Sequence, residues 1–310
     1  MKLTDLIQTG VSNRSQRVVI YGSNGIGKST LAAGFPGPVF VDTEDGTSHL
    51  DVHRIPVKNY DTLCKALEEL RKCELQCETI VIDTIDRVEL FLREIVCKEH
   101  RISGMEGLPY GKAYQFLIEK FNEFLTKYLD ALIFEGIHVV VVGHTNIKRV
   151  QFPGMDAFDR WELRLHTGCA NRLKEWADHV LLLNWDMRVI ENEGNPKGVG
   201  GKERVIFTNH SAAHDAKVRT PIAEKVPCTF NAIAPLLRDW QRPVKVSAQQ
   251  RLADALADID PKQLRAFLID RKQIRDDQQI IDVSCEYARE ALRRITEFKQ
   301  TVTEFDFIPT

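Results

Sequence analysis

The chain has 310 residues, of which 43% are hydrophobic and 28% are charged. This composition is that of a folded globular protein and excludes a disordered chain or a collagen, and the longest apolar segment, residues 137–142, is too short to cross a bilayer. Lys and Arg number 42 against 44 Asp and Glu, so the net charge of -2 excludes a uniformly basic surface and any nucleic-acid contact must be local. No membrane partner is expected.

The N-terminal segment, residues 1–16, lacks the long apolar stretch and small-residue cleavage site of a secretory signal. The seven cysteines are scattered and form no CxxC pair, so neither a disulfide framework nor a zinc ribbon is expected. Both observations indicate a cytoplasmic protein.

Five short segments rich in β-branched residues predict strands that are buried on both faces, namely residues 17–21, 39–42, 79–83, 138–143 and 179–183. Apolar residues at helical spacing predict helices between them, over about residues 60–72, 86–100 and 110–134. Because strands alternate with helices, we predict an α/β fold with a mostly parallel sheet flanked by helices.

The first predicted strand leads directly into a complete GxxxxGK[ST] motif, residues 22–29, and a helical segment follows it. Glycines let the backbone N–H groups curl around phosphates, Lys28 adds positive charge, and the Ser29 hydroxyl can complete the shell of a Mg²⁺ ion. The sequence therefore predicts a nucleotide site. The residues assigned to the nucleotide are Gly22, Ser23, Asn24, Gly25, Ile26, Gly27, Lys28, Ser29 and Thr30.

Three further candidates end later strands, where ligands of open parallel sheets bind. Asp83 ends an apolar strand and is predicted to anchor Mg²⁺, although an aspartate there can also cap the next helix. Glu44 follows the strand after the motif and is predicted to orient water, the alternative being a solvated acidic turn. His144 occupies the same position on another strand, where it can donate to the γ-phosphate or serve structure alone.

Residues 146–174 carry six basic against three acidic residues, with aromatic rings among them. Cations and flat rings together suit single-stranded DNA, whose phosphates they neutralise and whose bases they stack on. The alternative is that the rings pack beneath a long loop and the charges are solvated. The residues predicted to contact DNA are Lys148, Arg149, Phe152, Arg160, Trp161 and Arg164. A glycine-containing loop, residues 101–111, is a second and less basic candidate.

The pattern changes in the last third of the chain. A glycine-rich stretch, residues 194–201, lies between two strand-like segments and predicts a hairpin with a glycine-rich tip. Short helices are predicted to begin near Ser247 and at Asp260, where Pro261 is suited to the first helical position. We therefore expect an N-terminal segment 1–16, an ATPase core 17–243 and a small helical C-terminal domain 244–310.

Taken in order, these motifs resemble the RecA-like P-loop ATPase superfamily, and within it the phage-type minimal recombinases and single-strand annealing proteins. The resemblance runs from about residue 17 to residue 240. It implies ATP and Mg²⁺ as cofactors, Glu44 as the catalytic base, Asp83 as the Walker B residue and His144 as the γ-phosphate sensor. The phage group also matches Tyr110-Gly111 and Ala177-Asp178.

The same resemblance assigns Lys217 and Arg219, in the phrase Ala216-Lys217-Val218-Arg219-Thr220, to the paired cations that reach a neighbouring subunit's nucleotide. Cations supplied across an interface stabilise the transferring phosphoryl group. The implied partners are other copies of this chain, in a ring or a filament. Without the resemblance these two residues are exposed loop cations with no special role.

The function expected from the sequence is an ATPase that binds single-stranded DNA and promotes annealing or strand exchange, in a bacterial host cell if a phage encodes it. A nucleotide-dependent loader or switch, a RecA-fold helicase motor and a small-molecule kinase are the alternatives. The final residues, 303–310, are acidic with interleaved aromatics, which suits either recruitment of a single-strand-binding protein or a packed last strand.

Overall fold

The computed structural model describes residues 14–72, 77–151, 153–154, 156–192, 195–237, 248–275, 277–279 and 282–305. The chain divides into two compact units, Met1–Arg242 and Pro243–Thr310. Several predicted features lie outside the described residues: most of the N-terminal segment, Phe152, the helix start at Ser247, the domain boundary at 243 and the end of the acidic tail.

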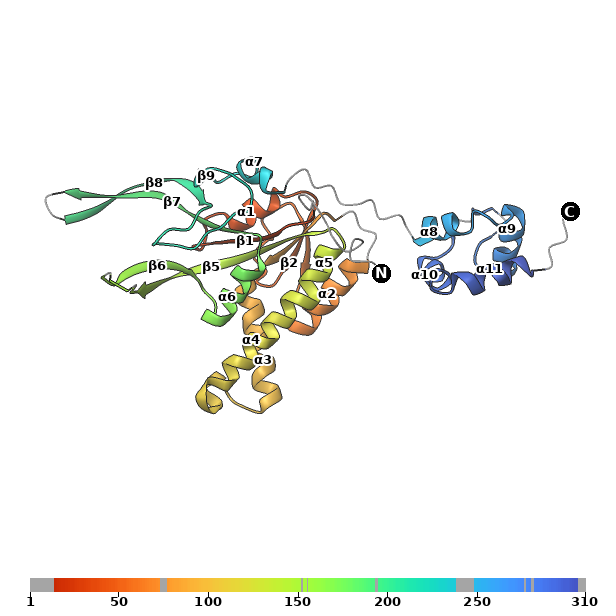
Figure 1. Ribbon diagram of the computed structural model, residues 1–310, viewed down its shortest axis with the longest axis horizontal. Helices are drawn as coiled ribbons and strands as arrows, with labels where there is room; N and C mark the ends of the chain where they lie inside the picture. Colours follow the sequence, from red (N-terminus) through yellow and green to blue (C-terminus); the bar gives the residue numbers. More distant parts are fainter. Residues whose placement is uncertain are drawn as a thin grey trace, which may run out of the picture. The chain divides into compact units, whose positions relative to one another are not determined.

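The first unit is built on one sheet with the strand order β3-β2-β4-β5-β1-β7-β8-β9, and β6 pairs with β5 (Figure 1). Neighbours from β3 to β7 run parallel, and the remaining pairs are antiparallel. The predicted mostly parallel sheet is therefore confirmed. The strands are β1 (Arg17–Gly22), β2 (Pro38–Asp42), β3 (His53–Pro56), β4 (Thr79–Asp83), β5 (His138–Val150), β6 (Phe158–Leu163), β7 (His179–Asn192), β8 (Asn195–Phe207) and β9 (Lys225–Pro227).

Helices cover both faces of this sheet. They are α1 (Lys28–Ala33), α2 (Tyr60–Lys72), α3 (Ile85–His100), α4 (Lys112–Glu123), α5 (Asp130–Phe134), α6 (Thr167–Trp176) and α7 (Phe230–Ile233), with short 3-10 turns η2 (Met105–Gly107), η3 (Pro109–Gly111) and η5 (Ala234–Leu237). Among the described residues, none of the helices combines the length and the apolar character needed to cross a bilayer.

The single helix predicted over residues 110–134 is interrupted by a π-helical segment, η4 (Phe124–Leu129), between α4 and α5. A π-turn shifts the faces of the helix relative to one another. Phe121, Phe124, Leu125 and Leu129 are all buried along this segment, so its apolar face packs on the core as the spacing predicts.

The central strands are buried on both faces, as their continuous apolar sequences predict. In β1, Val19 and Tyr21 pack on the face covered by α2, α3, α4 and α6. Val18 and Ile20 pack on the opposite face against α1, α7 and the segment that follows α7. Successive strand residues point to opposite faces, so a strand between two helical layers needs apolar residues at every position.

Two hairpins extend beyond the carboxyl end of β1 on the same side of the unit (Figure 1). β5 continues past His144 and pairs with β6, where the sequence suggested a loop. β7 continues past Leu183 and pairs with β8 in the predicted hairpin, and residues 195–201 of the glycine-rich stretch lie in β8. Gly200 and Gly201 have positive φ where the β7–β8 register shifts, which explains the need for glycine there.

The second unit is a bundle of short helices, α8 (Ala248–Ala255), α9 (Pro261–Asp270), α10 (Cys285–Arg293) and α11 (Ile295–Thr303). It has its own core, in which Phe267, Leu268 and Val302 are buried. The predicted start of α9 is confirmed: the Asp260 carboxylate accepts a hydrogen bond of 2.8 Å from the Lys262 backbone N–H, and Pro261 is the first helical residue.

Candidate nucleotide site

The glycine-rich motif forms a tight loop between β1 and α1. Gly25 and Gly27 have φ values of 73° and 102°, in the left-handed region that favours glycine. A Cβ at Gly22 would lie 2.6 Å from the Leu183 carbonyl oxygen, so the loop also needs glycine where it leaves the sheet. The loop therefore has the backbone shape of a phosphate-binding P-loop at the start of a helix.

Lys28 is the first residue of α1 and is only 6% exposed. Its ammonium group donates to the carbonyl oxygens of Gly22 and Ser23, at 3.1 and 3.0 Å, which holds it across the loop. Burial lowers the pKa of Lys28, and the nearby carboxylates of Asp83, Asp86 and Glu44 oppose that effect. The lysine thus lies in a buried site that is surrounded by acids.

Asp83 ends β4 beside the motif, and its carboxylate accepts a 2.6 Å hydrogen bond from the Ser29 hydroxyl. Burial raises the pKa of Asp83, although the contacts with Ser29 and Lys28 act in the opposite direction. A hydroxyl and a carboxylate oxygen are ligands that suit Mg²⁺, which takes its other oxygens from phosphates and water. These two residues fit a nucleotide-bound Mg²⁺, whose charge would stabilise the phosphates when bound. The described residues contain no group of three or more His, Cys, Asp or Glu that could hold a metal ion.

Glu44 lies just beyond β2, beside the end of β4, because Asp42 and Asp83 are paired in the register of the two strands. Its carboxylate accepts a 2.8 Å hydrogen bond from the Thr84 hydroxyl and is exposed. Asp42, which the sequence analysis did not assign, shapes this turn by accepting from the backbone N–H groups of Glu44 and Thr47 at 3.1 and 3.0 Å. Burial alone would raise the pKa of Asp42, but these hydrogen bonds hold it below its ordinary value.

His144 lies on β5 directly opposite Gly22 of β1. Its backbone N–H donates to the Asp86 carboxylate at 2.9 Å, and its ring Nδ1 lies 3.1 Å from the Arg164 guanidinium. Arg164 also donates to Asp86 at 3.0 Å. Burial would raise the pKa of Asp86, yet His144 and Arg164 hold it below its usual range. The structure therefore brings Arg164 to the edge of the sheet that carries the P-loop, here called the nucleotide edge, and not to the distal part of the β5–β6 hairpin.

Arg204 is a second residue at this site that the sequence did not indicate. It lies on β8, and its guanidinium donates to the Ile26 carbonyl oxygen at 3.3 Å. A Cβ at Gly27 would lie 2.6 Å from the same guanidinium. The contact joins residues 178 positions apart in the chain, so no local pattern could have predicted it.

Lys217 and Arg219 lie away from the P-loop of their own chain. Lys217 forms a backbone bridge with Val180 of β7, whereas Gly22 of the P-loop pairs with Leu183 of the same strand. Val180 and Leu183 are three positions apart, which is about 10 Å along the strand. The Lys217 ammonium donates to the Lys174 carbonyl oxygen at 2.5 Å, and burial lowers its pKa. Arg219 is exposed and lies 3.4 Å from the Asp178 carboxylate. Neither cation is brought to the site around Lys28.

The structure separates the described residues that were predicted to contact DNA into three groups: the hairpin residues Lys148, Arg149 and Trp161, the buried Arg160, and Arg164 at the nucleotide site. Lys148 and Arg149 are exposed on β5, and Trp161 lies half-buried opposite Ile147 across the hairpin. Arg160 is only 5% exposed, and its guanidinium is paired with Glu162 and Asp215 inside the chain. This burial argues against the DNA contact predicted for Arg160, because a guanidinium held by two carboxylates is not free to neutralise phosphate.

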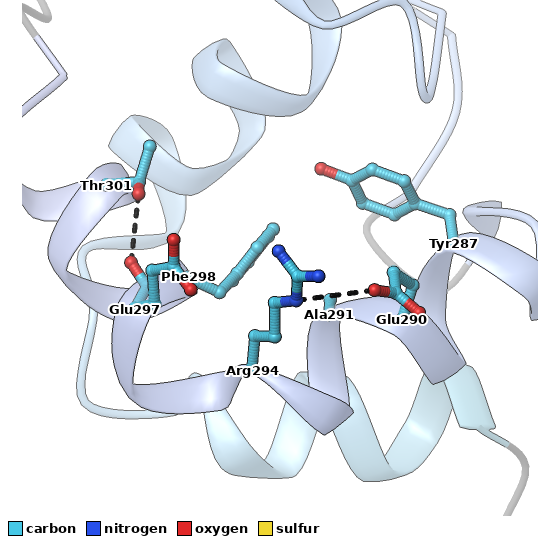
Figure 2. Close-up of a pocket in the computed structure, with 7 residues that line it drawn as sticks. All are labelled: Tyr287, Glu290, Ala291, Arg294, Glu297, Phe298 and Thr301. Carbon is cyan, nitrogen blue, oxygen red and sulfur yellow. Dashed lines mark hydrogen bonds and ion pairs between the residues drawn. The ribbon is translucent and has the colours of Figure 1, made fainter.

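Two pockets lie outside the P-loop. One, of about 450 Å³, is lined by residues around Lys217, including Lys174, His210 and Asp215. The other, of about 220 Å³, lies in the second unit between α10 and α11. Figure 2 shows its walls, where Arg294 pairs with Glu290 and Phe298 lies near Tyr287. None of the residues predicted to bind nucleotide or DNA lines this second pocket.

The P-loop, the buried lysine and the strand-end aspartate at the carboxyl edge of a mostly parallel sheet define a P-loop NTPase. Residues 14–220 match the AAA domain family AAA_24, and the chain belongs to this family. Family, fold and site together identify a P-loop ATPase domain of the AAA_24 family, with the mostly parallel α/β sheet that the sequence predicts.

Individual relatives are distant. An SPbeta prophage-derived uncharacterized protein, YorG of Bacillus subtilis (strain 168), is 24% identical over 136 residues, which are 41% of this chain and 40% of that protein. A KaiC-like protein of Pyrococcus horikoshii OT3 matches with 14% identity and a TM-score of 0.35, over 69% of this chain and 90% of that one. The RadB recombinase matches with 15% identity and a TM-score of 0.35, over 63% and 80%.

Proposed function

We propose that this protein is an ATPase that binds single-stranded DNA and uses ATP to control annealing or strand exchange. The observation that carries the proposal is the course of β5. This strand runs without interruption from the nucleotide edge, where His144 pairs with Gly22, into a hairpin that exposes Lys148 and Arg149. A single strand thus joins the nucleotide site to an exposed basic segment.

In the proposed reaction, the P-loop and Lys28 would hold the phosphates, and Ser29 with Asp83 would hold Mg²⁺. Glu44 orients the attacking water and accepts its proton, because it is an exposed carboxylate just beyond β2, beside the end of β4. Thr84 keeps the Glu44 carboxylate pointing in one direction through their hydrogen bond. His144 is proposed to contact the γ-phosphate from the neighbouring strand.

The proposed DNA surface is the exposed part of the β5–β6 hairpin. Arg149 supplies charge for phosphates on the face of the hairpin that also presents Ile147, which is 59% exposed, and Trp161, whose apolar surfaces suit bases. Lys148 adds charge on the opposite face of this two-stranded hairpin. Asp159 lies opposite Arg149 in the hairpin register, so the surface is locally basic rather than uniformly so. This composition favours a single strand bound without sequence readout.

The variant Lys148→Ala/Arg149→Ala is expected to weaken binding to a single-stranded oligonucleotide and to lower its salt dependence. Each phosphate contact that is lost should reduce the slope of log K against log salt by about 0.7. Fluorescence anisotropy with a labelled oligonucleotide, at several salt concentrations and with an ATP analogue present, measures both quantities.

The matched control is Lys58→Ala/Lys65→Ala, which removes the same charge from exposed positions away from the hairpin. This control should keep the affinity and the slope of the unmodified protein. Equal losses in the two double variants would show that only net charge matters, and the hairpin would then not be the DNA surface.

We also propose that Lys217 and Arg219 act on the nucleotide of a neighbouring copy, so that the active form is a ring or a filament. The bridge between Lys217 and Val180, about 10 Å along β7 from the level of the P-loop, supports a role outside its own site. Arg219 is exposed and so accessible to a neighbour. Cations supplied in this way would make hydrolysis depend on assembly.

A phage context is part of the proposal. The YorG relative is prophage-derived, which supports a phage origin for this chain. A loader or a helicase motor would use the same nucleotide site. Strand-annealing and duplex-unwinding assays with the purified protein separate these activities, and unwinding without annealing would favour the motor.

A further inference from the structure

His144 and Arg164 form the first rung of the β5–β6 hairpin. The register pairs Thr145 with Leu163, and the next backbone contact toward the sheet is a 2.9 Å hydrogen bond from the Arg164 N–H to the His144 carbonyl oxygen. The same two residues also touch through their side chains, since the Arg164 guanidinium lies 3.1 Å from His144 Nδ1. One residue pair therefore belongs both to the hairpin and to the nucleotide edge.

Asp86 fixes this pair from the first turn of α3. One carboxylate oxygen accepts from the His144 backbone N–H at 2.9 Å, and the other accepts from Arg164 Nε at 3.0 Å. Asp86 is buried, whereas the Arg164 side chain is 49% exposed. A buried carboxylate that accepts two charge-assisted or backbone hydrogen bonds is a rigid anchor, so the exposed guanidinium is held in one place.

Two groups face His144 Nδ1: the Arg164 guanidinium at 3.1 Å, which can only donate, and an Asp86 carboxylate oxygen at 3.3 Å, which can only accept. The shorter contact, with Arg164, is a hydrogen bond when Nδ1 accepts. In that arrangement the neutral ring carries its proton on Nε2. If the Arg164 side chain were absent, the remaining partner of Nδ1 would be the Asp86 carboxylate, 3.3 Å away, and Nδ1 would have to donate.

We propose that Arg164 is a positioning residue that holds His144 as an Nε2–H donor to the terminal phosphate of a bound triphosphate. The inference rests on the proposed function, because it requires a nucleotide at the P-loop. The Arg164 charge also acts on Lys28: burial is the main cause of the lowered pKa of Lys28, and the Arg164 charge adds to it. Arg164 thus links recognition of the γ-phosphate to the first residue pair of the β5–β6 hairpin.

Arg164→Met tests the proposal, because methionine keeps an unbranched chain and removes every donor. Calorimetric titration with ADP and with a non-hydrolysable ATP analogue, both with Mg²⁺, gives the preference of the protein for the triphosphate. The variant should lose on the order of tenfold of that preference while its ADP affinity stays the same. The matched control is Arg172→Met on α6, where an exposed arginine pairs with Glu175 at 3.1 Å and the preference should not change.

A spectroscopic readout separates positioning from loss of folding. In ¹⁵N spectra of the imidazole, recorded in mildly alkaline buffer where a free ring is neutral, His144 should show an unprotonated Nδ1 in the unmodified protein. The Arg164→Met variant should shift the proton toward Nδ1. The same tautomer in both proteins, or an unchanged triphosphate preference, would overturn the inference. Failure of the unmodified protein to bind either nucleotide would instead overturn the proposed function.

Discussion

Replacing Lys28 with alanine is expected to lower ATP turnover on the order of 10²–10³-fold, the effect of removing one preorganised charge or donor from a phosphoryl-transfer site. The ammonium group is buried and is held across the P-loop by two carbonyl oxygens, so its charge is already positioned before a nucleotide binds. Nucleotide affinity should fall as well, because the lysine contacts phosphate in the ground state and in the transition state.

Steady-state phosphate release and ADP titration measure the two effects of Lys28→Ala. Lys65→Ala, which removes an exposed lysine from α2, is the control and should retain normal turnover. Circular dichroism checks that both variants are folded. If Lys28→Ala hydrolysed ATP at the normal rate, the nucleotide would have to bind somewhere other than the P-loop.

Glu44→Gln is expected to lower turnover on the order of 10²–10⁴-fold and to leave nucleotide binding nearly unchanged. The amide oxygen of glutamine can still accept the hydrogen bond from Thr84, so the local structure should persist. What glutamine cannot do is accept the proton of the attacking water. The loss should therefore appear in kcat and not in affinity.

Single-turnover hydrolysis and equilibrium binding distinguish these two parameters for Glu44→Gln. Asp45→Asn is the matched control, because Asp45 is exposed in the same turn and asparagine tolerates its φ of 58°. A full rate in Glu44→Gln would indicate that another group activates water. Negligible turnover in the unmodified protein would instead favour a nucleotide-dependent switch.

The central part of the site could be predicted from the sequence because its signals are local. The motif around Lys28 specifies a loop shape by itself, and Asp83 and Glu44 follow strands whose parallel arrangement brings their ends to one edge. Continuous β-branched segments indicated the strands because both faces of the sheet are covered. Local chemistry and the rule of parallel strands were therefore sufficient for this part.

The rest depends on contacts between distant residues, which leave no periodic signal. Asp86 and Arg164 are 78 positions apart, and Arg204 reaches the P-loop from 178 positions away. The basic composition of residues 146–174 was visible, but not that Asp215 and Glu162 would hold Arg160 in the interior. The sequence did not predict β6 because this strand has only six residues, in which apolar and charged side chains do not alternate regularly.

Neighbouring copies of the chain and single-stranded DNA are both expected to activate the nucleotide site. The most direct test is the ATPase rate per protomer, measured over a series of protein concentrations with and without single-stranded DNA. The rate should rise with protein concentration and again with DNA, and Lys217→Ala/Arg219→Ala should abolish the rise while nucleotide binding remains. A rate per protomer that is constant at every concentration and unaffected by DNA would contradict the account.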